Sequence, residues 1–355
     1  MPTIRRRWII TILVTAAVSG CTSITIDDCG GAIERPGSAR IRSSDVRMQL
    51  ANPGAAADRF YLYAAMSALA YEGSGKCIDE KSKEDYSALR AALPTEWHRV
   101  NAVELADPCG DDRGLAYQVW ERHGQNTHDV VIAFRGTVSG LRSWIYGNLW
   151  GITHLFNSDT QYSRARTYSH RVIEYFRTRA DDGVTLRFYS TGHSLGGGLA
   201  QDVFYDRPKD FVQAFAFAPS SVTSFTELPK ASHLDACDCE TETLDHEARI
   251  YRIYEAYEIL GNLRFPHKLF FYPQRYIQEV RFSFPSSWNE VSRHSMKTLA
   301  FEMINLAKTA PSANGGPWFA GLGDSKNHMS CTELFVQKQS GSCALPAPES
   351  HGCPL

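Results

Sequence analysis

The chain lacks several features that mark common classes of protein. Its 355 residues carry 37 basic and 39 acidic side chains, for a formal net charge of −2, and contain no long basic run. Because nucleic-acid binding needs a positively charged surface, we do not expect it. No segment repeats along the chain, and no two cysteines have the C-x-x-C spacing of common zinc sites. We therefore expect neither a repeat architecture nor a metal.

Long apolar runs are also scarce. The stretch "WIITILVTAAV" (Trp8–Val18) has 11 residues, whereas a helix needs about 20 to cross a bilayer. It follows three arginines and precedes small residues, which is the layout of a secretory signal peptide. The next residues, "VSGC", resemble the lipobox of bacterial lipoproteins. That resemblance implies removal of residues 1–20 and acylation of Cys21, and Thr22 in place of Asp favours the outer membrane of the bacterial cell envelope. An ordinary signal peptide with a coincidental cysteine is the alternative.

The cysteine count agrees with an oxidising compartment. Acylation of Cys21 would leave eight of the nine cysteines, an even number that permits four disulfides. Their pairing cannot be deduced from the sequence. The nine are Cys21, Cys29, Cys77, Cys109, Cys237, Cys239, Cys331, Cys343 and Cys353.

Apolar patterns divide the rest of the chain. We expect a tether over residues 21–57, one folded domain over 58–310, and a cysteine-bearing extension over 311–355. Strands and helices alternate within the domain, which predicts an α/β fold with a largely parallel sheet. Strands are expected over 114–124, 129–137, 183–193, 211–220 and 248–255, and helices over 59–71, 162–180, 195–206 and 296–310.

One serine stands between a strand-like and a helix-like stretch. In "YSTGHSLGGGLAQDVF" (Tyr189–Phe204), Ser194 lies between Gly192 and Gly196. A nucleophilic serine projects from a tight strand-to-helix turn, where glycines two residues away on either side relieve crowding. The pattern G-x-S-x-G in this context predicts a nucleophile, and a plain turn between strand and helix is the alternative.

The stretches "SALAY", "VIAFRGT", "SWIYGNL" and "TGHSLGGGLA" together resemble the fungal-lipase-like (class 3) α/β-hydrolase family, over residues 59–310. The resemblance implies an α/β-hydrolase fold, with a mostly parallel central sheet flanked by helices. It also implies an oxyanion hole in which Thr137 donates its N–H and its hydroxyl and Leu195 donates a second N–H. Arg135 is interpreted as a structural ion-pair partner.

The acid of a catalytic triad follows the serine in such hydrolases. Aligning Arg252 and Ile253 with the family's strand puts Glu258 at the acid position, where the family usually has Asp. The alternatives are Glu255, Asp235, Asp238 and Asp245.

The histidine comes last in chain order. His294 lies in "SRHSMKTLA", immediately before a predicted helix, and resembles the family's His-Ser-Met entry to its last helix. His328 is the second candidate, and His267 and His351 are weaker ones. His193, next to the serine, is expected to be a packed core residue.

These residues predict a membrane-anchored serine acyl-hydrolase that acts through a Ser194–His294–Glu258 triad and an acyl-enzyme, without a cofactor or a metal. A lipid ester is the expected substrate, with lipase or phospholipase A1 activity. Residues Leu141–Phe156 place apolar side chains on one helical face, which favours either a lid or a packed core helix. Two alternatives are a catalytically silent lipoprotein that binds lipid or protein, and a peptidase or thioesterase.

Overall fold

The computed structural model describes residues 38–42, 47–50, 52–72, 85–105, 115–136, 161–220, 249–258, 260, 277–284 and 292–309. Several predictions concern residues outside these ranges: the signal peptide, all nine cysteines including Cys21, Thr137, residues 141–156 and 311–355, His267, His328, His351, Asp235, Asp238 and Asp245. Among the described residues, no helix has the length and apolar character needed to cross a membrane.

The core of the fold is one sheet of nine described strands, in the order β2-β1-β9-β8-β7-β6-β5-β4-β3. The five strands from β5 to β9 are parallel, whereas β3 and β4 at one edge and β1 and β2 at the other pair antiparallel. The strands are β1 (Ala39–Arg42), β2 (Arg47–Gln49), β3 (His98–Arg99), β4 (Tyr117–His123), β5 (Thr127–Phe134), β6 (Thr185–His193), β7 (Phe211–Phe217), β8 (Ile250–Glu255) and β9 (Ile277–Phe282).

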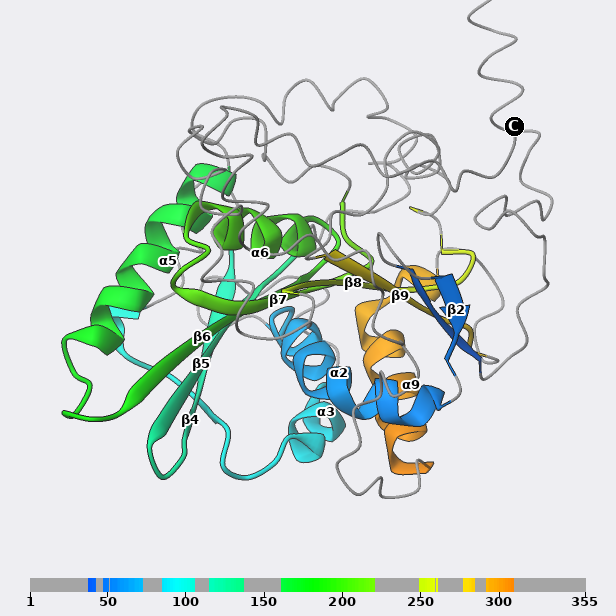
Figure 1. Ribbon diagram of the computed structural model, residues 1–355, viewed down its shortest axis with the longest axis horizontal. Helices are drawn as coiled ribbons and strands as arrows, with labels where there is room; N and C mark the ends of the chain where they lie inside the picture. The colour runs from blue at the N-terminus through cyan, green and yellow to red at the C-terminus, as the bar shows by residue number, and fades with distance from the viewer. Residues whose placement is uncertain are drawn as a thin grey trace, which may run out of the picture.

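Helices cover both faces of the sheet (Figure 1). One face carries α2 (Pro53–Leu69), α3 (Ser87–Ala92) and α9 (Met296–Thr309), and the other carries α5 (Gln161–Arg177) and α6 (Leu195–Asp206). Two short 3-10 helices, η3 (Val103–Leu105) and η7 (Ser292–His294), complete the described elements.

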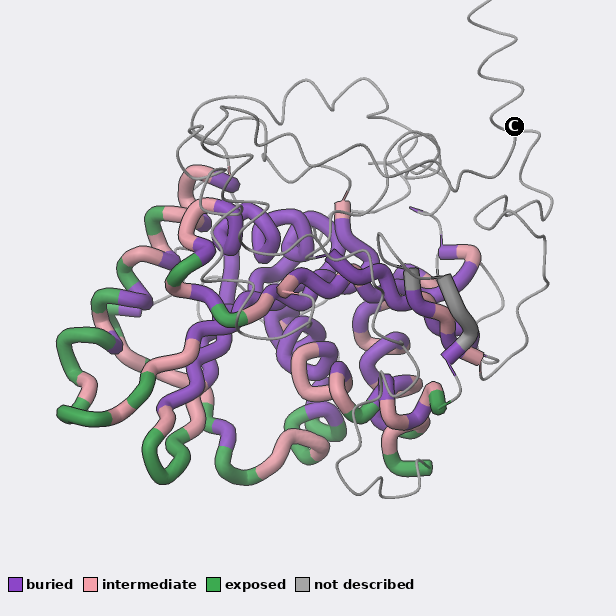
Figure 2. Tube along the Cα trace, in the orientation of Figure 1, coloured by how far each residue is buried: buried purple, intermediate pink, exposed green. Residues whose placement is uncertain are grey.

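This cover explains why the central strands are apolar on both sides. Along β5, Val131 and Ala133 pack in the cluster beneath α2 and α9, whereas Val130 and Ile132 pack in the cluster beneath α5 and α6. Successive side chains of a strand point to opposite faces, so a strand covered on both sides needs apolar residues at every position. Figure 2 shows the result, with buried strands in the centre and exposed turns at the lower ends.

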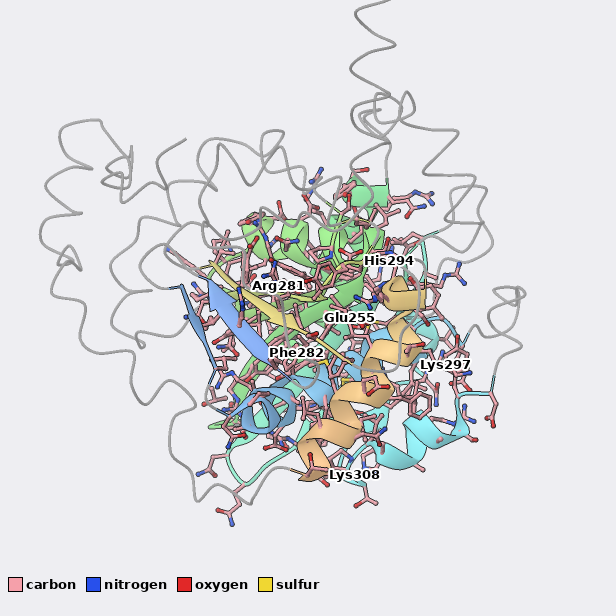
Figure 3. All side chains as sticks on the ribbon, turned by 90° about the vertical axis from the view of Figure 1, so that its right-hand side faces the viewer. Glu255, Arg281, Phe282, His294, Lys297 and Lys308 are labelled. Carbon is pink, nitrogen blue, oxygen red and sulfur yellow. The ribbon has the colours of Figure 1, made fainter. Side chains whose placement is uncertain are left out.

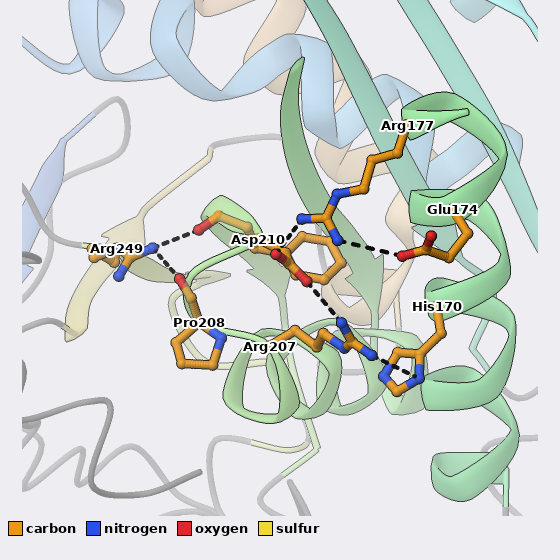
Figure 4. Close-up of polar contacts among 8 residues, drawn as sticks. His170, Glu174, Arg177, Arg207, Pro208, Asp210 and Arg249 are labelled. Atoms are coloured by element: carbon orange, nitrogen blue, oxygen red, sulfur yellow. Dashed lines mark hydrogen bonds and ion pairs between the residues drawn. The ribbon is translucent and has the colours of Figure 1, made fainter. Parts of the chain in front are cut away.

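Charged side chains join α5 to the segment between α6 and β7 (Figure 4). Arg177 Nη2 donates to Asp210 Oδ1 at 2.6 Å, and Arg207 Nη1 donates to Asp210 Oδ2 at 3.3 Å. His170 Nε2 lies 2.6 Å from Asp206 Oδ2. These groups are partly exposed, so each contributes modestly to stability, and together they align two neighbouring helices.

The predicted fold class is confirmed: the chain has an α/β fold, in which a mostly parallel central sheet lies between two layers of helices. The expected tether needs a correction in its second half. Residues 39–42 and 47–49 are strands of the sheet, and α2 begins at Pro53 rather than near residue 59. Ala39 and Ile41 are buried, but β1 has only four residues, and an alternation this short cannot be recognised in the sequence.

Candidate active site

Ser194 occupies a sharp turn between β6, which ends at His193, and α6, which begins at Leu195. Its backbone has φ 56° and ψ −120°, a conformation that residues other than glycine rarely adopt. Hydrogen bonds hold this conformation. The Ser194 N–H donates to the Phe217 carbonyl at 3.0 Å, and the Ser194 carbonyl accepts from the N–H of Gly197 and of Ser220, each at 3.0 Å. The strain persists because the surrounding backbone fixes it.

Three glycines allow the chain to pass this closely. A Cβ on Gly192 would lie 2.3 Å from the Gly196 carbonyl oxygen, and a Cβ on Gly196 would lie 2.3 Å from a carbonyl oxygen at the end of β5. A Cβ on Gly136 would lie 2.4 Å from the His193 carbonyl oxygen and 3.2 Å from the Cβ of Ser194. The G-x-S-x-G pattern and the glycine of "FRGT" therefore have one cause, which is the close approach of backbone around the serine.

Glu258 and His294 form a buried pair. The His294 Nδ1 lies 2.9 Å from the Glu258 Oε2, and the two residues are only 5% and 1% exposed. The same Oε2 accepts a hydrogen bond from the Leu260 N–H at 2.8 Å. His294 is the last residue of η7, and one residue separates it from the start of α9 (Figure 3). Of the two glutamates weighed as the acid, Glu258 is thus the one that contacts His294, whereas Glu255 is buried at the end of β8.

His193 connects this pair to the serine turn. Its ring packs against the His294 ring, with centroids 4.6 Å apart, and its Nδ1 lies 2.8 Å from the Tyr71 hydroxyl. A further hydrogen bond joins the segment before His294 to the segment after β8, because Arg293 Nη1 donates to the Ala256 carbonyl at 3.0 Å. The prediction that His193 is a packed core residue is confirmed, since it is 4% exposed.

The contact of Tyr71 was missed by sequence reasoning. Tyr71 ends the stretch "SALAY", and its hydroxyl is also the group that a Cβ on Gly136 would meet at 2.4 Å. The stretch that contains Tyr71 was noticed in the sequence, but nothing local showed that its hydroxyl reaches a residue 122 positions away.

The beginning of α6 supplies the electrostatics of an anion site. Ser194 is the N-cap residue of α6. The structure describes every residue of this helix, and the Ser194 side chain makes no capping hydrogen bond to it. The first N–H groups of a helix have no partner within the helix and carry partial positive charge, so they stabilise a negative charge beside them. Leu195 is the first residue of α6. Thr137 lies outside the described residues, and Gly136 before it lies against Ser194.

Sheet topology brings these residues together. Ser194 follows β6, Glu258 follows β8, and His294 follows β9. Because these strands are parallel, their carboxyl ends meet at the same edge of the sheet, which is where open α/β folds bind ligands. The site therefore combines a strained serine, a histidine paired with a buried carboxylate, and a helix N-terminus.

Comparisons with known proteins give weak likenesses. No protein-family model and no curated protein matches the chain. Among solved structures, a lipase from Rhizopus microsporus var. chinensis is 17% identical, with 71% of this chain and 86% of that chain covered and a TM-score of 0.39. Lipase II from Rhizopus niveus is 17% identical, with 62% and 79% covered and a TM-score of 0.35. An esterase from Pyrococcus furiosus is 10% identical, with 61% and 91% covered and a TM-score of 0.29. Likenesses this weak carry no argument, so function is argued from the geometry of the chain itself.

Proposed function

We propose that the protein is a serine hydrolase of carboxylic esters, with Ser194 as nucleophile, His294 as general base and Glu258 as the acid that orients it. The observation that carries the proposal is the buried His294–Glu258 pair, packed against the residue that precedes a serine in a strained strand-to-helix turn. A serine hydroxyl is a weak nucleophile without a base, and a histidine oriented by a carboxylate is the usual base.

The proposed mechanism assigns each atom a role. Glu258 accepts the hydrogen bond from the His294 Nδ1–H, which leaves Nε2 as the ring nitrogen that takes the proton of the Ser194 hydroxyl. The serine oxygen attacks the ester carbonyl, and the negative charge on the carbonyl oxygen is stabilised by the N–H of Leu195 and by Thr137. His294 then gives its proton to the departing alcohol. Water attacks the acyl-enzyme by the same route in reverse and releases the acid.

A glutamate fits the position of the acid. Tyr257, directly before Glu258, has a φ of 63°, which turns the chain sharply after β8. The carboxylate is then fixed from two sides, by the Leu260 N–H at 2.8 Å and by His294 at 2.9 Å. The extra methylene of Glu compared with Asp is accommodated because the backbone turn and the Leu260 N–H together set where Oε2 lies.

We extend the proposal to the substrate and the location of the protein. The lipobox-like "VSGC" supports acylation of Cys21 and anchoring in the bacterial cell envelope, at the outer membrane. An enzyme held at a membrane by acyl chains meets lipid esters at high local concentration, and the many apolar side chains in the sequence of residues 141–156 would suit an acyl chain. The substrate class we propose is therefore a lipid ester, cleaved with lipase or phospholipase A1 specificity.

The test is labelling with a fluorophosphonate probe, together with hydrolysis of p-nitrophenyl esters. We expect the probe to label the wild type and not Ser194→Ala, and kcat to fall by at least about 10⁴-fold in that variant. Ser190→Ala is the matched control, because Ser190 is a buried serine of β6, the strand that leads to Ser194, and its hydroxyl donates to the Ala200 carbonyl at 2.8 Å. It should keep both labelling and activity.

Two results would contradict the proposal. A folded wild type that neither reacts with the probe nor hydrolyses esters would favour the silent lipid- or protein-binding lipoprotein. Cleavage of peptide anilides in preference to esters would favour a peptidase. Hydrolysis of defined triglycerides and phospholipids then separates lipase from phospholipase activity.

A further inference from the structure

A second cluster of reactive side chains lies far from Ser194. Glu121, His123 and His128 each offer one ligand atom, and these three atoms lie within 4.8 Å of one another. The Oε2 of Glu121 is 2.9 Å from the Nε2 of His128 and 3.5 Å from the Nε2 of His123. The two imidazole rings face each other, with centroids 3.9 Å apart and planes 31° apart. The proposed ester hydrolysis makes no use of these residues.

The backbone holds the cluster in a rigid place. His123 and His128 are directly opposite each other in the antiparallel pairing of β4 with β5, and Glu121 lies two residues before His123 on the same face of β4. The turn that joins the strands is tight, with the Gly124 N–H donating to the Thr127 carbonyl at 2.7 Å. Because the turn fixes the register, it also fixes which side chains meet across the two strands.

The surroundings orient one histidine and expose the other. The ring of His128 is buried and packs edge-on against Phe176 of α5, with centroids 5.1 Å apart. The side chain of His123 is 67% exposed, and that of Glu121 is 25% exposed. His128 and Glu121 are therefore held in place, whereas His123 can rotate from solvent to complete a site.

We propose that Glu121, His123 and His128 form a zinc-binding site that braces the β4–β5 hairpin at the edge of the sheet. Two histidines and one glutamate are a ligand set that proteins use for Zn²⁺ with a water in the fourth position. Tetrahedral zinc places its ligand atoms roughly 3.3–3.5 Å apart. The two distances from Glu121 bracket this value, and rotation of His123 brings the third distance into range.

The cluster differs from an ordinary ion pair in its second histidine. An ion pair between His128 and Glu121 requires only one imidazole. The Nε2 of a second imidazole, that of His123, faces the same carboxylate oxygen, and this adds the further nitrogen ligand that a divalent cation such as zinc takes. His98 lies directly opposite Glu121 in the pairing of β3 with β4, so a further imidazole stands next to the cluster on the neighbouring strand.

The role of this site is structural. The cluster lies at the start of β5, whereas the end of that strand passes beside the serine turn, and a strand of this length spans about 20 Å. Zinc would add a link between two strands that are already joined by backbone hydrogen bonds, by one tight turn and by the hydrogen bond from Arg122 Nε to Asp129 Oδ2 at 3.0 Å. The prediction from cysteine spacing that the chain holds no metal missed this possibility, because these ligands come from two paired strands and contain no cysteine.

The test is titration of the chelator-treated protein with Zn²⁺ by calorimetry, and with Co²⁺ by visible absorption. We expect one ion per chain, tetrahedral Co²⁺ bands, and a higher melting temperature with Zn²⁺. His123→Ala removes an exposed ligand, and Glu121→Gln removes the charge while keeping the size of the side chain. Each should weaken binding at least about 10-fold and remove the thermal shift. Ester hydrolysis should be unaffected in both variants.

His170→Ala is the matched control, because His170 is also a partly exposed histidine beside a carboxylate, with its Nε2 2.6 Å from Asp206 Oδ2. It should bind Zn²⁺ like the wild type. Absence of stoichiometric binding in the wild type overturns the proposal. Binding that persists unchanged in both His123→Ala and Glu121→Gln overturns it too, because the ion would then be held elsewhere, for example by cysteine thiols, which both variants retain.

Discussion

Replacement of Glu258 by glutamine isolates the charge of the proposed acid from its geometry. A single oxygen, Oε2, accepts from both the Leu260 N–H and the His294 Nδ1, at 2.8 and 2.9 Å. The amide oxygen of glutamine can accept both hydrogen bonds from the same position. Glu258→Gln should therefore keep the histidine in its orientation and its tautomer, and remove only the negative charge that stabilises the imidazolium formed during attack.

The size of the effect follows from the distance. A unit charge about 4 Å from the centre of the imidazolium contributes about 4 kcal/mol at the effective dielectric constant of 20 that describes protein sites. Each 1.36 kcal/mol corresponds to a tenfold change in rate, so kcat should fall about 10³-fold. If the amide instead turned its NH₂ group toward His294, the wrong tautomer would be favoured and the loss would approach 10⁴-fold.

The assay is steady-state hydrolysis of a p-nitrophenyl ester, with thermal unfolding to confirm that the variant folds. Glu255→Gln is the matched control, since Glu255 is an equally buried carboxylate at the end of β8 and was the other glutamate considered as the acid. A folded Glu258→Gln protein with kcat within about 10-fold of the wild type would refute the assignment. Loss of activity in Glu255→Gln alone would move the acid to that residue.

Two further predictions concern stability. Tyr71→Phe removes the hydroxyl 2.8 Å from the buried His193 Nδ1 and should lower the free energy of unfolding by about 1–3 kcal/mol in urea titrations. Tyr61→Phe, on a partly exposed residue of α2, should change the free energy of unfolding little. Equal stability of Tyr71→Phe and wild type contradicts the role of this contact. Burial raises the pKa of Tyr189 and of Tyr205, so the folded protein holds these protons more tightly than the unfolded chain, and stability should be retained below the usual tyrosine value near 10 and fall as the pH rises above it. Tyrosinate absorbance that reaches its full value before the protein unfolds at high pH contradicts this.

Local sequence patterns correctly predict the strand and the helix on either side of Ser194. Alternation and apolar runs predict the strand before the serine and the helix after it, and the structure has β6 ending at His193 and α6 over Leu195–Asp206. The same patterns do not predict the strands at the edges of the sheet, where β2 has only three residues and β3 only two. Such short strands carry too few residues for a period to be visible, and their existence depends on the neighbouring strand.

The sequence by itself determined the turn chemistry and the alternation of elements. Gly192 and Gly196 are required by contacts within a few residues of the serine and with the adjacent strand, so their spacing is readable in the chain. Strand and helix periods are local in the same way, because side-chain direction repeats every two residues in a strand and every 3.6 in a helix.

Tertiary structure alone decided which distant groups meet. Glu258 reaches His294 across 36 residues, because parallel strands deliver their carboxyl ends to one edge of the sheet. Tyr71 reaches His193 across 122 residues, because α2, which ends just before Tyr71, packs against β6. The Glu121, His123 and His128 cluster depends on a single register between β4 and β5, and a slip of one residue would turn one member to the opposite face. Contacts of this kind depend on strand order and register, which no local pattern of residues specifies.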